Sequence, residues 1–348
     1  MTEPTTDPDT EYRQITSLAV FSLGGTIVST SEGAGAEPRI TVQDLLDGVA
    51  VPESIRLTAR TCCQKPSTEL FLADLSELVR SAAQAVEDGA QGVVVTTGTD
   101  TLQEVAFALD LLWEAAEPLV LTAAMRPADR PGADGPANLA SALRVAAMTD
   151  FAGLGCVVVL NDQIHAARHV QKRHTTNPAA FTSPNAGPIG FVHESGASLL
   201  VKPCGRPSLP KPRQGLGMPH VAIVPMCLDD DGRLLSAIAG LGFDGVVLDA
   251  AGGGAVPAAW VPHVAKLSSN IPTIYASRTG AGPVNTASYS GPGLDIDLQR
   301  NGAIPSGLLT ALQSRILLAQ CISAGLTREQ IAETFRDPFG QRSRSPGG

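Results

Sequence analysis

Two glycines and a threonine follow an apolar run near the start of the chain, in the segment SLGGTI at residues 22–27. In an open α/β sheet, ligands bind beyond the carboxyl ends of the strands, and glycines there let a substrate approach backbone N–H groups. The pattern therefore predicts Gly25 as a backbone contact and places Thr26 at the rim of a cleft. A tight turn with a solvated threonine would produce the same short motif. Residues 29–39 are small, polar and glycine-containing, which is typical of a mobile lid rather than a regular element.

A second polar cluster, TTGTDT at residues 96–101, lies between an apolar run and a predicted helix. A helix N-terminus stabilises anions and offers free N–H donors, so this turn suits a bound carboxylate or a developing oxyanion. Asp100 suits a substrate ammonium group. The order Thr101-Leu-Gln-Glu104 matches a capping box, which predicts that the helix begins there. A cap alone would explain one or two of these polar residues, but not all of them.

A third candidate is Lys172, in the polar segment VQKRHTTN at residues 170–177. The pKa of a lysine amine adjusts readily to its surroundings, so such a group can activate a hydroxyl. A solvated lysine is the alternative. Nearby, His165, His169 and His174 lack an accompanying HExxH glutamate, so we predict solvated or structural histidines, with no metal and no cofactor. Asp295 and Asp297 are predicted as the solvated face of a strand.

The elements that must position these residues alternate between short apolar runs and amphipathic stretches, the pattern of a parallel sheet covered by helices. The prediction is an α/β fold: a larger N-terminal domain with a mostly parallel sheet flanked by helices, plus a smaller C-terminal α/β domain. The predicted boundaries are a disordered tail at 1–15, domains at 16–201 and 220–339, a linker at 202–219 and a disordered tail at 340–348. Predicted strands are 18–22, 92–96, 118–122, 154–160, 220–225, 245–248 and 272–275. Predicted helices lie within 68–88, 101–114, 137–148, 233–239, 257–267, 307–324 and 327–335.

The composition narrows the function classes. Of 348 residues, 43% are hydrophobic and 17% charged, which argues against disorder. The net charge of −9 disfavours nucleic-acid binding, which needs clustered basic residues, so a small-molecule partner is expected. The chain has no apolar run long enough to cross a membrane. Its beginning lacks the basic-then-apolar order of a signal peptide, and its six cysteines have no CxxC spacing, so a cytoplasmic protein with reduced cysteines is expected.

Four motifs together resemble one family. In order and spacing they are similar to the bacterial-type L-asparaginases and glutaminase-asparaginases, and the similarity extends from about Ser17 to Phe335. The motifs are SLGGTI (22–27), TTGTDT (96–101), AMRPADRPGADGPAN (124–138) and QKRHTTNPAAF (171–181).

The resemblance implies the larger-plus-smaller domain fold, a homo-oligomer (dimer or tetramer) and hydrolysis of the asparagine side-chain amide without metal or cofactor. It also implies slower glutaminase activity. By resemblance, Thr26 is the nucleophile that forms an acyl-enzyme, supported by the hydroxyl of Thr99, the carboxylate of Asp100 and the amine of Lys172. The residues that bind the substrate would be Gly25, Ser67, Thr68, Gly98 and Asp100.

The chain departs from the family pattern at several positions. Leu23 replaces a threonine and is predicted to pack in the interior. Thr97 replaces a histidine and is predicted to leave a hydrogen-bond donor near the site. The lid lacks the usual tyrosine, with Arg39 or Ile40 near its place; a hydroxyl of Ser29, Thr30, Ser31 or Thr41 could substitute, or Lys172 alone could activate Thr26. The C-terminal segments at 250–254 and 279–289 lack polar residues that contact the substrate amine in relatives, so a higher KM is expected.

These departures keep two other interpretations open. One is a weakened or inactive relative that binds an amino acid or a protein partner without turning it over. The other is an amidotransferase subunit acting on aminoacyl-tRNA, which is disfavoured because the sequence shows neither an additional N-terminal domain nor a basic surface.

Overall fold

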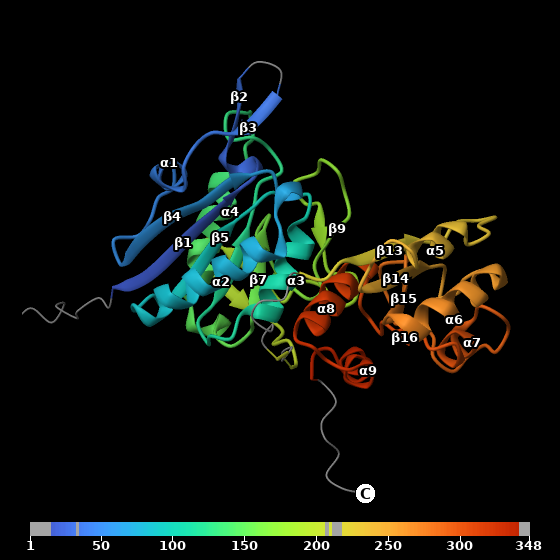
Figure 1. Ribbon diagram of the computed structural model, residues 1–348. Helices are drawn as coiled ribbons and strands as arrows, with labels where there is room; N and C mark the ends of the chain where they lie inside the picture. The colour runs from blue at the N-terminus through green and yellow to red at the C-terminus, as the bar shows by residue number, and fades with distance from the viewer. Residues whose placement is uncertain (1–14, 33–34, 206–208, 211–217, 341–348) are drawn as a thin grey trace, which may run out of the picture.

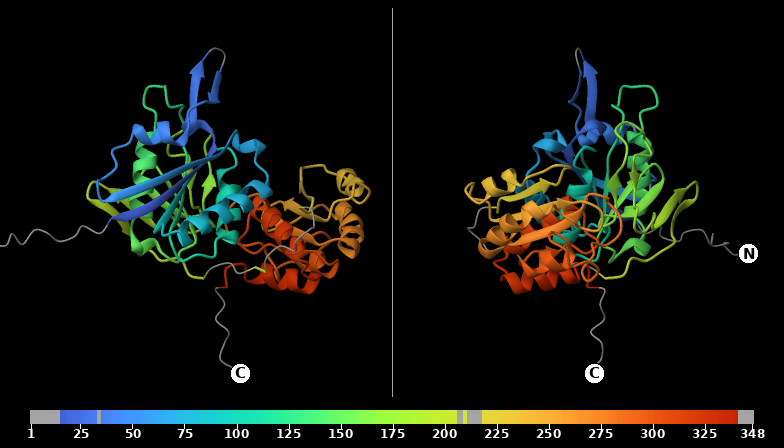
Figure 2. Two further views of the ribbon diagram at one scale, coloured as in Figure 1. Left: turned by 60° about the vertical axis from the view of Figure 1, so that its left-hand side comes forward. Right: turned by 90° about the vertical axis from the view of Figure 1, so that its right-hand side faces the viewer.

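The computed structural model describes residues 15–32, 35–205, 209–210 and 218–340. They form two α/β domains that lie side by side (Figures 1 and 2). The first contains an eight-stranded sheet of order β12-β11-β8-β7-β6-β5-β1-β4. Strands β4, β1, β5, β6 and β7 run parallel, and the remaining pairings are antiparallel. The strands are β1 (Thr16–Gly24), β4 (Ile55–Lys65), β5 (Gly92–Thr96), β6 (Leu119–Thr122), β7 (Cys156–Leu160), β8 (Gln163–Ala166), β11 (Gly190–His193) and β12 (Gly196–Leu199).

Helices cover both faces of this sheet, because its central strands are buried on both sides. Alternate residues of one strand enter different cores: Val93 and Val95 pack with α2 and α3, whereas Val94 packs with α1 and α4. The mostly parallel sheet with flanking helices confirms the predicted fold class. The helices are α1 (Val42–Asp47), α2 (Leu72–Glu87), α3 (Leu102–Leu112) and α4 (Gly135–Ala146).

The second domain is a four-stranded parallel sheet of order β13-β14-β15-β16. Helices α5 and α6 pack on one face, and α8 and α9 pack on the other. Helix α8 also contacts α3, so one apolar core continues across the boundary between the domains. The elements are β13 (Val221–Pro225), β14 (Gly245–Ala250), β15 (Thr273–Ser277), β16 (Ile304–Pro305), α5 (Arg233–Ile238), α6 (Val261–Asn270), α7 (Asp295–Arg300), α8 (Ala311–Ser323) and α9 (Arg328–Arg336).

Two local predictions are wrong. The segment predicted as an irregular lid forms an antiparallel hairpin, β2 (Ser29–Glu32) and β3 (Gly35–Pro38), which projects from the first domain in Figure 1. The aspartates predicted on a solvated strand lie instead in the first turn of α7. Asp295 is buried and accepts hydrogen bonds from the backbone N–H groups of Ser288 and Tyr289, so it holds the turn before the helix.

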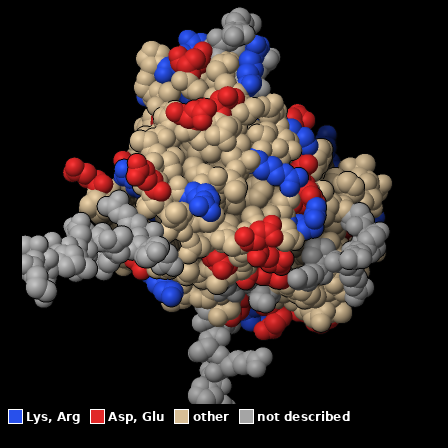
Figure 3. Space-filling view, turned by 90° about the vertical axis from the view of Figure 1, so that its left-hand side faces the viewer, with Lys and Arg blue, Asp and Glu red and all other residues tan. Residues whose placement is uncertain are grey.

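The predicted tails and most of the predicted linker fall outside the described residues, so the proposed domain boundaries stay predictions. On the face drawn in Figure 3, acidic and basic side chains are interspersed, and those of the described residues form no continuous basic stripe. Among the residues that the structure describes, no helix is long and apolar enough to cross a bilayer.

Candidate active site

Thr26 lies directly after the carboxyl end of β1, at the start of the 3-10 helix η1 (Thr26–Val28). The turn before it requires glycine, because Gly24 and Gly25 have φ angles of 104° and 88°. Gly25 also packs against the next strand's turn: a β-carbon there would lie 2.2 Å from the backbone nitrogen of Gly98. This contact places the Thr26 turn beside the TTGTDT turn, as the sequence predicts. Among the described residues, the Thr26 hydroxyl makes no hydrogen bond.

The TTGTDT turn leaves β5 beside the Thr26 turn, because β1 and β5 are parallel neighbours in which Ser22 pairs with Thr96. Gly98 packs closely on Ser67, whose side chain would lie 2.9 Å from a β-carbon at position 98. Ser67 is buried and begins the 3-10 helix η2 (Ser67–Glu69), whereas the neighbouring Thr68 is exposed. Gly25, Gly98 and Ser67 therefore form one continuous backbone surface.

Lys172 reaches this surface from β9 (Gln171–Lys172), which pairs with β10 (Phe181–Thr182). Its Nζ donates to Thr99 Oγ1 at 3.0 Å and to Asp100 Oδ1 at 2.8 Å. The Lys172 side chain is 17% exposed and that of Asp100 is 71% exposed, so the carboxylate faces solvent while the amine is largely enclosed. The hydroxyl, carboxylate and amine predicted to act together are in direct contact, although the lysine lies more than 70 positions along the chain from its partners.

Two glutamines that the sequence analysis missed hold Lys172 in place. Gln103, in the first turn of α3, accepts a hydrogen bond from the Lys172 backbone N–H at 2.9 Å. Gln171 Nε2 donates to the carbonyl of Gly280 at 2.7 Å, which ties the lysine strand to a C-terminal-domain loop. Asn185 accepts from the Gly282 N–H and makes a second link to that loop. A glutamine in a sequence does not by itself indicate a catalytic or positioning role. The roles of Gln103 and Gln171 are visible only from their contacts in the structure.

The predicted capping box at Thr101 does not form. Thr101 Oγ1 donates to the Ser67 carbonyl at 2.8 Å, and the Thr101 N–H donates to Ser67 Oγ at 3.3 Å. The Thr101 side chain consequently does not cap α3. The Glu104 backbone N–H donates to the Thr101 carbonyl, but its side chain does not bond back to position 101. Its Oε2 is buried without a hydrogen-bond partner among the described residues. The capping pattern in the sequence is therefore not realised, because Thr101 instead makes the contact that holds the Ser67 turn.

The departures from the family pattern have structural consequences. Leu23 is buried in the core, as predicted. Thr97 is fully buried and its hydroxyl has no hydrogen-bond partner within the described residues, so its role as a donor near the site stays a prediction. Of the candidate substitutes for the lid tyrosine, the buried Ser29 hydroxyl donates to the Gly25 carbonyl, and Thr41 bonds to Asp44 as the N-cap of α1.

The three histidines are dispersed. His165 is buried and its Nδ1 lies 2.9 Å from Ser183 Oγ, and burial lowers its pKa to about 4. His169 packs edge-on against Phe339, and burial likewise lowers its pKa to about 4. His174 is exposed and accepts two backbone hydrogen bonds at Nδ1. Among the described residues, no three His, Cys, Asp or Glu side chains gather in a way that could hold a metal ion.

Comparison with known proteins assigns the chain to a family. Residues 17–203 match the model of the N-terminal domain of asparaginase, and residues 220–335 match that of the glutaminase/asparaginase C-terminal domain. The chain belongs to the asparaginase family. This confirms the family resemblance of the four sequence motifs.

Individual relatives agree with this assignment over nearly the whole chain. An L-asparaginase of Bacillus licheniformis is 31% identical over 324 residues, which cover 91% of this chain and 98% of that protein. L-asparaginase 2 of Escherichia coli is 30% identical over 71% of each chain. A crystal structure described as a "Probable Cytoplasmic L-asparaginase from Campylobacter jejuni" superposes with a TM-score of 0.83 at 26% identity, covering 92% of this chain and 99% of that one.

Proposed function

We propose that this chain is an L-asparagine amidohydrolase that releases aspartate and ammonia through an acyl-Thr26 intermediate. One observation carries the proposal: the Lys172 amine contacts both the Thr99 hydroxyl and the Asp100 carboxylate, next to the turn that bears Thr26. A threonine hydroxyl is a weak nucleophile unless a neighbouring group accepts its proton. The Thr99–Lys172 pair is such an acceptor, with Lys172 acting as a neutral amine, and Asp100 stabilises the ammonium that forms when the proton arrives.

In the proposed reaction, Thr26 Oγ1 attacks the side-chain amide carbon, and its proton passes through the Thr99–Lys172 pair to the leaving nitrogen. The carbon–nitrogen bond breaks and ammonia departs. Water then adds to the acyl carbon and the ester bond to Thr26 Oγ1 breaks. A proton from that water restores the Thr26 hydroxyl, and aspartate is released. Gly25, Ser67, Thr68 and Gly98 would contact the substrate, and the exposed Asp100 would bind its ammonium group.

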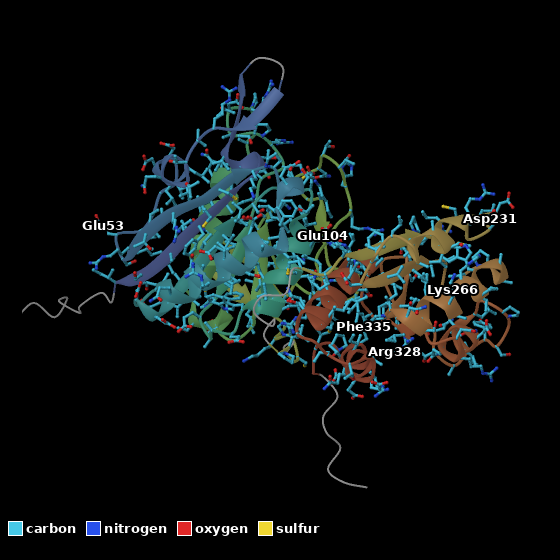
Figure 4. All side chains as sticks on the ribbon, in the orientation of Figure 1. Glu53, Glu104, Asp231, Lys266, Arg328 and Phe335 are labelled. Atoms are coloured by element: carbon cyan, nitrogen blue, oxygen red, sulfur yellow. The ribbon has the colours of Figure 1, made fainter. Side chains whose placement is uncertain are left out.

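Ammonia release from L-asparagine by the purified protein tests the activity. We expect Thr26→Ala and Lys172→Met each to lower kcat by about 100-fold or more, because a positioned acid or base contributes roughly 10²–10⁴-fold. Thr149→Ala and Lys266→Met are the matched controls; both residues are exposed, and Figure 4 shows Lys266 in the C-terminal domain. Unchanged turnover in a folded Thr26→Ala or Lys172→Met variant would reject the assigned role.

The finer properties of this function are part of the same proposal. We propose slower hydrolysis of glutamine, a homo-oligomer (dimer or tetramer) and a cytoplasmic location. Support comes from the family, whose C-terminal model is named for glutaminase as well as asparaginase, and from the Campylobacter jejuni structure, which is described as a probable cytoplasmic L-asparaginase. Among the relatives is also a Haemophilus influenzae protein described as periplasmic. Activity on glutamine, sedimentation velocity and cell fractionation test these three points separately.

The competing function is an amino-acid-binding protein without turnover. The Thr97 hydroxyl, which is buried and has no partner among the described residues, favours it, because Thr97 occupies a position where relatives place a hydrogen-bonding ring. Calorimetry that detects bound aspartate, combined with no ammonia release from asparagine, would select this alternative.

A further inference from the structure

A groove lies where the first domain meets the C-terminal domain, next to the candidate active site. Its volume is about 520 Å³, and its walls come from η2, the start of α2, the first turns of α3, the segment before β13 and α8. It shares Ser67 and Thr68 with the candidate active site but is not lined by Thr26, Thr99 or Lys172. Figure 4 shows Glu104 at this boundary. Its apolar wall residues are Leu70, Phe71, Leu72, Leu75, Val105 and Ile316.

Glu104 is the negative group of this groove. Its Oε2 is buried and has no hydrogen-bond partner among the described residues. Burial raises the pKa of the carboxyl, and the helix backbone and the positive charge of Arg315 oppose that rise only in part. A buried carboxylate without a partner is costly, so a cation bound in the groove next to the Glu104 carboxyl group would stabilise its charged form.

Arg315, on α8, is the positive group. Its Nε donates to the Val221 carbonyl at 3.0 Å, and its terminal nitrogens make no hydrogen bond to the other described residues. The Arg315 side chain lines the groove. Arg315 influences Glu104 electrostatically, yet no salt bridge joins the two within the described residues. The groove thus presents two opposite charges that face one space without neutralising each other.

We propose that this groove binds a second ligand, an α-amino acid with an apolar side chain, whose ammonium contacts Glu104 and whose carboxylate contacts Arg315. A ligand with a single charge would leave one of the two protein charges unpaired, whereas a zwitterion pairs both. The apolar walls, including the 68% exposed Phe71, would cover the ligand's side chain. The volume lies within the usual range of small-molecule sites, roughly 300–1,000 Å³.

Calorimetric titration with L-leucine tests the site, in the wild-type protein and in the Thr26→Ala variant. We expect one leucine bound per chain with equal affinity in both. Glu104→Gln and Arg315→Gln should each weaken binding by about tenfold or more, the loss expected for one charge-assisted hydrogen bond. Glu53→Gln, the same chemical change at an exposed position far from the groove in Figure 4, should bind leucine like the wild type.

Ligand analogues complete the test. 4-Methylpentanoate lacks the amine and 3-methylbutylamine lacks the carboxylate, so each should bind at least about tenfold more weakly than leucine. Saturating L-aspartate should not displace leucine. The inference is overturned if leucine at roughly 50 mM does not bind, because a functional site would have a much higher affinity. It is also overturned if the Glu104 and Arg315 variants bind leucine normally, or if aspartate competes with leucine. Ammonia release is not used as a readout, so a negative result would leave the proposed hydrolysis standing.

Discussion

The contact between Gly25 and Gly98 determines how closely the Thr26 turn approaches its supporting residues, and Gly25→Ala tests it. A β-carbon at position 25 would lie 2.2 Å from the Gly98 nitrogen and 2.3 Å from its Cα. Ordinary van der Waals contact begins near 3.4 Å, so the two turns must separate by about 1.2 Å. A displacement of roughly 1 Å at a reacting group costs about 100-fold in rate. We therefore expect kcat/KM for asparagine to fall by about 100-fold.

Gly89→Ala is the matched control for Gly25→Ala. Gly89 has a φ of 103°, close to that of Gly25, but no atom lies within 4 Å of the β-carbon that alanine would add. Both variants carry the left-handed backbone penalty of about 1–2 kcal/mol, and only Gly25→Ala must also move the Thr26 turn. Ammonia release and thermal unfolding are measured for both. If folded Gly25→Ala matched Gly89→Ala in kcat/KM, the close contact would not be what positions Thr26.

Three further predictions concern stability, pH and the positioning of the lysine. Asp110→Ala leaves the charge of the fully buried Arg168 unpaired, so urea unfolding should show a free energy of unfolding lower by about 3–5 kcal/mol. A decrease below about 1 kcal/mol would contradict a structural role for this ion pair. His165 is neutral in the folded chain, whereas the unfolded chain binds a proton near pH 6.5, so this group lowers stability by about 2 kcal/mol between pH 7 and pH 5. His165→Asn should reduce the pH dependence of the free energy of unfolding by that amount, and an unchanged slope would contradict the assignment. Gln103→Leu removes the acceptor of the Lys172 backbone N–H and should lower kcat by about tenfold with little change in KM; an effect on KM alone would indicate a role in binding.

The parts of the fold that the sequence predicts are those with an uninterrupted apolar signal. All five residues of β5 are buried, and the prediction matches its bounds. In contrast, β4 was not predicted, although it is the longest strand described. Most of its residues are exposed, because β4 lies at the edge of the sheet and pairs only with β1. Its stability comes from hydrogen bonds to a distant segment, which no local pattern records.

The same distinction applies to the site. Thr26, Thr99 and Asp100 follow buried parallel strands, so the sequence alone places them at one edge of the sheet. Lys172 lies on a two-residue strand that follows the antiparallel part of the sheet, where periodicity indicates nothing about direction. Its position in the cleft could be predicted only from the family resemblance. Its contact with Thr99 spans 73 positions and depends on Gln103 and Gln171, which hold the strand from two sides.

The failed capping box explains why two unusual features occur together. A Thr101–Glu104 box would have satisfied both side chains locally and contributed about 1 kcal/mol to α3. Instead, Thr101 holds the Ser67 turn, and Glu104 lines the groove with Arg315 while its buried Oε2 has no hydrogen-bond partner within the described part of the chain. Local rules in a sequence are expected to fail where function imposes a different demand. The partner of Thr101 lies in the candidate active site, and Glu104 lines the proposed amino-acid groove. The loss of one capping box therefore frees one side chain for each of the two sites. The Glu104→Gln variant separates them: it should weaken leucine binding while leaving the Thr101–Ser67 contact, and therefore asparagine hydrolysis, unchanged.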